Sequence, residues 1–334
     1  MTSRNLFSVT AVPAVLILFF LAAPVSVSAS YAGDRPPETV FHENISGGYL
    51  FSAGNSTYSG PLTPGDRYTA TFDMSLPTGA EIIYERVYVY WAWSKCGQKA
   101  VYPSMQIVRH SKNQSSLSCA DRYVDNKGVR GSNDFFSGMD ACSGADLKSG
   151  DNLFSVQIEN TGTNNSGFVI QGIGVLGVYA DESGKRGQIW VSEGCDMLYA
   201  GFGISPEMAT SRISFPGRIN TGAVRGADLF LVAPSGGYTR SDIDGKNMLS
   251  FNHNGKDSLP SFIEMIIRSL FPGYNGKQWS DVFVSDDIHQ IGTDIRDVKA
   301  YLRPDGNYAE IRDSGDYLLL TNAVLMVETK EGST

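Results

Sequence analysis

The sequence predicts an all-β protein made of two tandem β-sandwich modules of the jelly-roll or immunoglobulin type, with one short amphipathic helix inserted in the second module. Three observations predict this fold. Short alternating or densely apolar stretches recur along the chain, clusters of Gly, Asn and Asp separate them at hairpin-like intervals, and the order of these stretches repeats once. Because strand lengths vary and the insertions are long, we expect sandwiches rather than closed barrels.

The N-terminus has the form of a secretory signal peptide. Arg4 supplies a basic start, residues 11–23 form an apolar run, and small residues lead to a cleavage site after Ala29. The run is short for a bilayer span, which takes about 20 residues. We therefore expect residues 1–29 to be removed and the mature protein to be extracellular or on the cell surface. An uncleaved N-terminal anchor is the alternative, and it also exports the chain.

The expected strands divide into two modules joined near residues 183–201. In the first module, residues 30–185, strands are expected at residues 67–76, 85–94, 152–158 and 167–180. In the second, residues 186–334, they are expected at residues 187–192, 227–233, 281–285 and 316–330. A helix is expected at residues 257–273, where apolar residues recur at helical spacing between an early proline and a Pro-Gly stop. Its apolar face is typical of a helix that covers the end or flank of a sandwich.

The internal repeat pairs three segments of each module. Residues 75–92, 147–158 and 174–181 correspond in order and chemistry to residues 214–233, 302–311 and 323–330. Gly172, Gly174 and Gly177 match the G-x-G-x-x-G spacing of a dinucleotide-binding turn, but a turn follows them instead of a helix. The repeat also places Ala323 and Met326 at the positions of Gly174 and Gly177. The stretch therefore predicts a strand, and no nucleotide cofactor is expected.

Charge and cysteine content narrow the function classes. The net charge is -8 and no run of basic residues occurs, which argues against nucleic acid as a partner. The four cysteines, an even number in an exported chain, predict two disulfides. The sequence leaves all three pairings open, and the absence of a C-x-x-C pair argues against zinc. The cysteines are Cys96, Cys119, Cys142 and Cys195.

Four N-x-S/T sequons lie in surroundings rich in Gly, Ser and Asn, which are typical of exposed loops. In an exported protein they predict N-glycosylation if the host has the machinery. The acceptor residues are Asn44, Asn55, Asn113 and Asn164.

Four stretches together resemble a known family: residues 86–103, residues 159–181, the short VSEGCDML at residues 191–198 and residues 315–328. The chain resembles, from about residue 48 to residue 329, a domain family of unknown function found in exported, cell-surface proteins of archaea, chiefly methanogens. The resemblance implies an extracellular β protein, often one module of a larger surface chain. It implies no catalytic residues.

No catalytic motif is present: the sequence has no G-x-S-x-G, H-E-x-x-H or P-loop, and its four histidines are widely separated. We predict no catalytic residue. A hydrolytic carboxylate pair could still assemble in space. The groups considered for it are Glu193 with Asp196, or Asp281, Asp286 and Asp287.

Two ligand sites are considered, each beside a structural alternative. Asp242, Asp244 and Asn247 surround a glycine in an oxygen-rich loop that resembles a calcium loop, although the closing glutamate is missing. Without that glutamate, a solvated Asx turn is the favoured interpretation. Trp91 and Trp93 share one face of a strand and could stack on a sugar, but rings on both faces of that strand favour core packing. No cofactor other than calcium is considered.

The leading hypothesis is a secreted, non-enzymatic structural protein of the cell surface or envelope, which acts by self-association or attachment to an envelope layer. Its expected partners are itself or other envelope proteins. The alternatives are an extracellular carbohydrate-binding or adhesion module, with glycans as partners, and a secreted glycoside hydrolase.

Overall fold

The computed structural model describes residues 33–112, 114–130, 133–237, 244–253, 266 and 276–330. These residues form nineteen strands and two short 3₁₀ helices, η1 (Thr221–Ala223) and η2 (Lys299–Tyr301). The all-β prediction is confirmed for this part of the chain. The predicted signal peptide lies outside it, and so does the predicted helix at residues 257–273 apart from Ile266. In the described residues no helix has the length and hydropathy of a membrane span.

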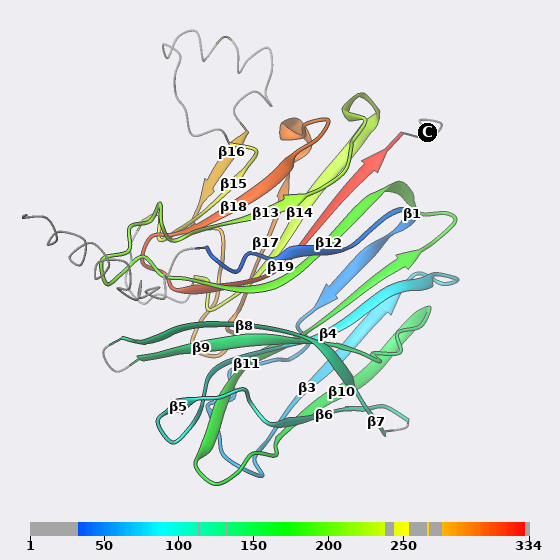
Figure 1. Cartoon of the computed structure of the whole chain (residues 1–334). Helices are drawn as coiled ribbons and strands as arrows, with labels where there is room; N and C mark the ends of the chain where they lie inside the picture. Colours follow the sequence, from blue (N-terminus) through cyan, green and yellow to red (C-terminus); the bar gives the residue numbers. More distant parts are fainter. Residues whose placement is uncertain are drawn as a thin grey trace, which may run out of the picture.

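Eleven strands form one large antiparallel sheet (Figure 1). Its main path runs in the order β17-β14-β19-β12-β1-β11-β4-β9-β8, while β2 pairs with β11 and β5 with β4. The strands are β1 (Glu38–Ser52), β2 (Pro61–Leu62), β4 (Glu81–Cys96), β5 (Lys99–Ala100), β8 (Ser118–Arg130), β9 (Asn133–Ser143), β11 (Ser166–Ala180), β12 (Lys185–Leu198), β14 (Val224–Pro234), β17 (Ile291–Asp297) and β19 (Leu318–Thr329).

Two small antiparallel sheets complete the fold. The first small sheet has the order β3-β10-β6-β7 and the second has the order β13-β18-β15-β16. The first contains β3 (Arg67–Leu76), β6 (Met105–His110), β7 (Gln114–Ser116) and β10 (Gly150–Asn160). The second contains β13 (Thr210–Phe215), β15 (Asn247–Phe251), β16 (Lys277–Ser280) and β18 (Asn307–Asp313).

The large sheet folds back on itself into two arms. The first arm is β11, β4, β9 and β8, and the second arm is β12, β19, β14 and β17. Four steps separate β4 from β19 in the strand order, a distance of about 19 Å in a flat sheet. Yet Tyr90 Oη donates to Asn322 Oδ1 at 2.8 Å, and the rings of Phe51 and Phe230 lie 5.0 Å apart. The molecule therefore has four layers: a small sheet, the first arm, the second arm and the other small sheet (Figure 1).

Strand β1 follows this fold from one arm to the other. Residues 38–47 pair with β12 and residues 47–52 pair with β11, so that Gly47 lies at the turn between β11 and β12. A Cβ atom at Gly47 would lie 2.0 Å from the carbonyl oxygen of Tyr179. Only glycine allows the backbones to approach so closely.

Burial follows the layers. In β3, an outer strand, buried and exposed residues alternate along the whole strand, as expected when one face covers a core and the other meets solvent. In β19 the first ten residues are all buried, because the second arm has neighbours on both faces. Two outer cores lie between each small sheet and its arm, and Phe72 and Leu229 are among their fully buried members. A third cluster, which we call the inter-arm layer, lies between the arms and contains Tyr88, Tyr90, Ile189 and Val324.

The internal repeat is present in the strand pairing. β10 pairs with β3 as β18 pairs with β13, and β11 neighbours β4 as β19 neighbours β14. The turns at residues 147–152 and 302–307 match in their hydrogen bonds. Asn152 accepts from the Lys148 amide at 2.9 Å and donates to its carbonyl at 2.7 Å, and Asn307 makes the same pair with Arg303 at 2.8 and 2.9 Å.

The expectation of two independent modules is not supported, because the large sheet continues from one half into the other through β1. The predicted boundary after residue 185 falls at the first residue of β12, where the sheet folds. What repeats in the two halves is the small sheet and the order of the strands that pair with each other. The arms need each other, since each buries its second face against the other arm.

Candidate functional site

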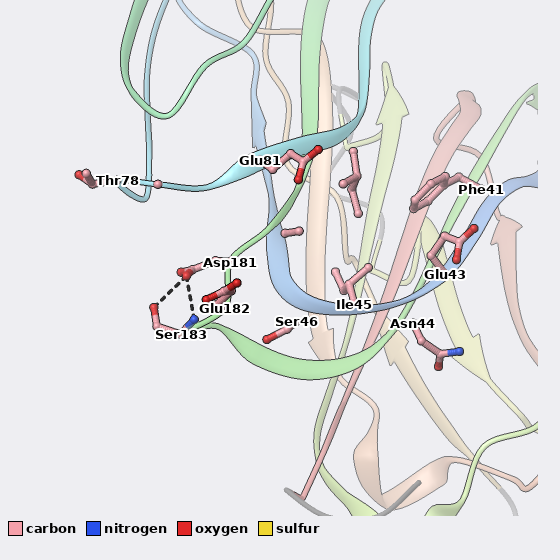
Figure 2. Close-up of a pocket in the computed structure, with 13 residues that line it drawn as sticks. Phe41, Glu43, Asn44, Ile45, Ser46, Thr78, Glu81, Asp181, Glu182 and Ser183 are labelled. Atoms are coloured by element: carbon pink, nitrogen blue, oxygen red, sulfur yellow. Dashed lines mark hydrogen bonds between the residues drawn. The ribbon is translucent and has the colours of Figure 1, made fainter.

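An acidic hollow of about 760 Å³ opens beside the N-terminal half of β1 (Figure 2). Four carboxylates line it: Glu43 from β1, Glu81 from β4, and Asp181 and Glu182 from the turn between β11 and β12. No lysine or arginine is among the described residues that line it. Asp181 also holds this turn in place, since it accepts from the amide of Ser183 at 2.9 Å.

A basic hollow of about 1020 Å³ lies on the other side of the same segment of β1. Arg186, Arg218 and Lys330 line it, and no carboxylate is among its described lining residues. Both hollows are bordered by Asn44, Ile45 and Ser46. The fold of the large sheet thus places an acidic and a basic surface side by side, although the protein is acidic as a whole.

The inter-arm layer contains a buried glutamate surrounded by tyrosines. Glu193 of β12 accepts hydrogen bonds from the hydroxyls of Tyr84 at 2.6 Å, Tyr88 at 2.9 Å and Tyr123 at 3.0 Å. Arg86 Nε lies 3.4 Å from the same carboxylate. Burial and the neighbouring Glu193 carboxylate raise the pKa of Tyr88 well above its usual range. These contacts tie β4 and β8 of the first arm to β12 of the second.

A second polar cluster lies where β8 meets β12. Lys127 is buried, and its ammonium contacts Asp34 and lies 2.9 Å from Asp125 Oδ2. Burial lowers the pKa of Lys127, but the two carboxylates outweigh burial and the pKa stays above its usual range. Asp196 is fully buried and accepts from Ser211 Oγ at 2.5 Å. Burial raises its pKa to about 7.

Residues 30–328 match the family described as "Protein of unknown function (DUF3344)". The chain belongs to this family. The match confirms the resemblance to a family of unknown function over most of the chain, and its archaeal, methanogen-centred distribution stays a prediction. Among solved structures, the major capsid protein P2 from bacteriophage PM2 aligns with 85% of this chain and 100% of its own, at 10% identity and a TM-score of 0.20. That TM-score carries no conclusion about fold or function. No curated protein sequence matches the chain.

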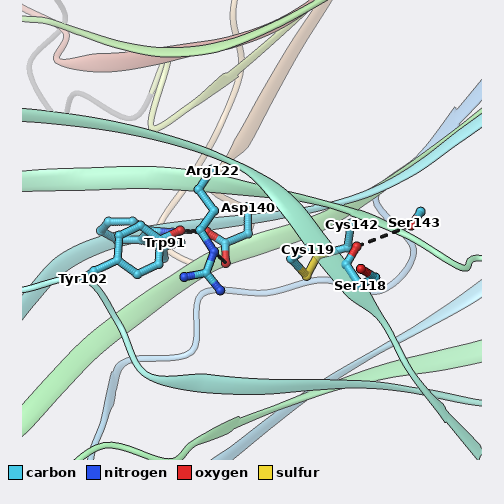
Figure 3. The surroundings of a disulfide bond; sticks show 8 residues. All are labelled: Trp91, Tyr102, Ser118, Cys119, Arg122, Asp140, Cys142 and Ser143. Atoms are coloured by element: carbon cyan, nitrogen blue, oxygen red, sulfur yellow. Dashed lines mark hydrogen bonds and ion pairs between the residues drawn. A yellow bond between two sulfur atoms is a disulfide. The ribbon is translucent and has the colours of Figure 1, made fainter.

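In this DUF3344 protein one disulfide is present instead of the two expected. Cys119 of β8 is bonded to Cys142 of β9 (Figure 3). Cys96 and Cys195 are free, because Cys96 lies at the end of β4 beside Thr163, whereas Cys195 is buried in β12 of the other arm. Next to the disulfide, the buried Asp140 accepts from Trp91 Nε1 at 3.2 Å and from the hydroxyl of Tyr102.

The sequons lie in different settings. Asn55 and Asn164 are exposed in turns, as predicted, and Asn113 lies outside the described residues. Asn44 is exposed as well, but it belongs to β1 and pairs with Gln188 instead of lying in a loop. Its side chain stands at the border of the two hollows.

The structure brings together only part of the predicted calcium loop. Asp242 lies outside the described residues and Asp244 is exposed. Asn247 is buried, and its Oδ1 accepts from the Val282 amide at 2.8 Å while its Nδ2 donates to Asp316 at 2.6 Å. Its side-chain oxygen therefore already has a partner in the protein.

The two tryptophans considered for glycan binding are separated by the structure. Trp91 is fully buried in the first outer core, where its ring meets Phe136 at 5.3 Å edge to face. That position excludes it from a surface site. Trp93 is 45% exposed and lines a hollow of about 80 Å³. Its φ of 54° interrupts the alternation that predicted a shared face.

None of the carboxylates considered for hydrolysis lines either charged hollow. Glu193 and Asp196 are both buried and engaged as described above. Asp281 accepts from the amides of Gly245 and Lys246 at 3.0 Å each, and Asp286 accepts from the amides of Ile288 and His289. The acidic hollow was not predicted, nor were Lys127 and Asp125. Charged residues at i and i+2 of the strand-forming segment VDNKG were the signal available for these two.

Proposed function

We propose that this DUF3344 protein is an exported, non-enzymatic structural protein of the cell surface that acts by self-association. Its first contact is a two-fold dimer made through the acidic and basic hollows. The observation that carries the proposal is the adjacency of two open, oppositely charged hollows, which share residues 44–46 of β1 as their border. Attachment to an envelope layer and the archaeal setting belong to the same proposal.

Symmetry explains why adjacent hollows of opposite charge favour a second copy as the partner. A two-fold interface uses the same patch on both subunits, so the patch must be complementary to itself. A two-fold axis beside Asn44 would set Glu43 and Glu182 of one copy against Arg186 and Arg218 of the other, twice over. Such complementarity contributes to specificity and rate of association more than to affinity.

Three features support export. The family match begins at residue 30, directly after the predicted cleavage site. The Cys119–Cys142 disulfide is typical of oxidising compartments. Asn55 and Asn164 are exposed in turns, where a transferase could reach them.

The test uses the mature chain and two charge-reversal variants, measured by sedimentation equilibrium. One variant carries Glu43→Lys with Glu182→Lys, and the other carries Arg186→Glu with Arg218→Glu. We expect a wild-type dimer that weakens as salt increases, because exposed charges are screened over about 8 Å at physiological ionic strength. Neither variant should dimerise alone, and an equal mixture of the two should form mixed dimers.

The control is Lys99→Glu, an exposed charge reversal on β5, away from both hollows. It should leave the dimer unchanged. A monomeric wild-type protein at high concentration would refute the dimer. So would variants that dimerise like the wild type.

A carbohydrate-binding role is the second candidate, and the 45% exposed ring of Trp93 favours it. The adjacent hollow is too small to enclose a sugar, so binding would rest on stacking against the ring. Titration with soluble glycans, followed by tryptophan fluorescence, tests this role. Loss of the response in Trp93→Ala would support binding, and release of free sugar in the same samples would point to a glycoside hydrolase.

A further inference from the structure

Lys127 has an unusual environment for a lysine. It is 2% exposed, and its ammonium contacts two carboxylates, Asp125 on its own strand and Asp34 on the N-terminal segment that passes over β12. Oxygen atoms of Asp34, Asp125 and Asp196 all lie within 4.8 Å of one another. One buried amine therefore contacts two carboxyl groups, and a third carboxyl group lies beside them.

The cluster is incompletely satisfied as an ionic network. Asp196 is fully buried, yet its Oδ1 has no hydrogen-bond partner. Burying ionised groups is costly, and such groups tend to become neutral instead. A metal ion is not needed to explain the three carboxylates, because the Lys127 ammonium already contacts two of them.

We propose that Lys127 and Asp34 form an intramolecular amide bond. It would join the N-terminal segment covalently to β8. The bond does not depend on the proposed dimer, and it would be a second covalent link beside the Cys119–Cys142 disulfide.

The reaction balances without an oxidant or a co-reactant. Once Asp125 has accepted a proton from the ammonium, the neutral Lys127 Nζ attacks Asp34 Cγ, the new Nζ–Cγ bond forms, and one Cγ–O bond breaks. The ammonium and the carboxylate together lose one oxygen and two protons, which leave as one water molecule. Asp125 touches Nζ and is the base that accepts a proton from it and returns it to the departing oxygen. Asp34, whose side chain is 49% exposed, gives the water a route to solvent.

Two physical terms favour the amide over the ion pair. Fixed proximity is one, since well-oriented intramolecular groups react with effective molarities of about 10⁵ M or more. Desolvation is the other, because the neutral amide removes the charge of the buried Lys127 ammonium, which burial opposes. Asp196 then lies beside an amide instead of an ammonium.

Intact mass spectrometry of the denatured, reduced and deglycosylated exported protein tests the bond. We expect a mass lower by one water molecule than the sequence of the mature chain requires. Digestion should yield one branched peptide that contains both Asp34 and Lys127. A mass equal to the sequence would overturn the proposal, and so would a water loss confined to one linear peptide.

Three variants test which residues form the bond and which one acts as the base. Lys127→Arg and Asp34→Ala should restore the full mass, and Asp125→Ala should slow or abolish the water loss with both reacting groups intact. The matched control is Lys185→Arg, which changes an exposed lysine paired with Glu328 and should retain the water loss. The wild-type measurement decides the proposal even if a variant fails to fold.

Discussion

The outer cores and the inter-arm layer are both buried, yet different chemistry holds them together. Between each small sheet and its arm the contacts are apolar: Phe72 and Phe154 of the first small sheet share a core with Val89 and Ile173 of the first arm. Between the arms, apolar side chains share the interface with Glu193, Asp196 and Lys127. Residues of the outer cores can be exchanged for other apolar residues of similar volume with little loss of stability. Replacing a charged residue of the inter-arm layer costs more, because its partner stays buried without a counter-charge or hydrogen bond.

The polar groups of the inter-arm layer determine how the two arms pack against each other. Two apolar faces can pack against each other in more than one register. A buried carboxylate that needs three hydroxyl donors is satisfied in only one register of the two arms. The hydroxyls around Glu193 come from β4 and β8, on the opposite arm. The polar groups therefore set how the arms pack, and the outer cores supply most of the apolar burial.

The largest expected loss of stability comes from one substitution in the inter-arm layer and one in the first outer core. Glu193→Ala leaves three tyrosine hydroxyls without their acceptor and removes the carboxylate that pairs with Arg86, and we expect the free energy of unfolding to fall by about 3–5 kcal/mol. Phe72→Ala should cost a similar amount, about 3–5 kcal/mol, through a cavity in the first outer core. Hydrogen exchange distinguishes them. Glu193→Ala should speed exchange in β4, β8 and β12, and Phe72→Ala in β3 and β10.

Glu193→Gln is the matched control, since it keeps an acceptor at the same position. It should cost clearly less than Glu193→Ala. Equal stability of wild type and Glu193→Ala would show that the tyrosine contacts do not hold the arms.

The next effect is a pH dependence of stability, to which Asp196, where the two arms meet, should contribute. Burial raises the pKa of Asp196 from 3.8 to about 7 in the folded protein. Between these values the folded chain binds a proton that the unfolded chain has lost, so the free energy of unfolding falls as the pH rises from about 4 to about 7. The full difference corresponds to about 4 kcal/mol at most. Urea titrations across this range measure it.

Asp196→Asn removes the titrating group but keeps an acceptor for Ser211. This variant should be more stable than the wild type above about pH 7, and its stability should depend less on pH between about 4 and 7. An unchanged pH profile in Asp196→Asn would assign the dependence to other groups. Phe72→Ala should keep the wild-type profile at a lower stability.

The smallest of the three effects concerns the disulfide that holds β8 to β9. Cys119 and Cys142 are 23 residues apart, and removing a bridge of this length costs about 3 kcal/mol in the chain-entropy model. The double variant Cys119→Ala, Cys142→Ala should lower the urea midpoint, and reductant should then have no further effect. Because β8 carries Tyr123, Asp125 and Lys127, faster hydrogen exchange should appear first in the inter-arm layer.

Cys96→Ala is the control, since Cys96 forms no disulfide. It should respond to reductant as the wild type does. A double variant as stable as the wild type would mean that the β8–β9 pairing alone holds this edge.

Local pattern was enough to predict much of the fold. Alternation in residues 67–76 predicted β3 with the observed bounds. The comparison of residues 147–158 with 302–311 predicted the matching turns at Asn152 and Asn307. The glycine-rich stretch was correctly interpreted as a strand: Gly174 lies against Phe51, where a Cβ would come within 2.7 Å of the ring. Turns depend on residues that are close in sequence, and strands depend on the alternation of side chains between two faces, so both can be predicted from a short stretch of sequence.

The candidate sites were less predictable. Glu193 and Asp196 were considered only as a hydrolytic pair, and the hydroxyl groups that bind Glu193, on Tyr84 and Tyr123, lie far away in sequence. The hollows combine residues from β1, from the turn after β11 and from loops of the second half. In the sequence, the charged residues that line the hollows look like any other charged residues on a solvated surface.

The sequence by itself determined several strands, their repeated order and the matching turns at Asn152 and Asn307, because side-chain periodicity and turn chemistry act over a few residues. The strand predicted at residues 281–285 is wrong: these residues form no strand, and Asp281 has a φ of 53°. Only the tertiary structure decided that the two halves share one sheet, that Cys119 pairs with Cys142, and that Lys127 meets Asp34. The physical reason is the fold at Gly47, which turns a flat sheet into two facing arms and brings residues of distant strands within bonding distance.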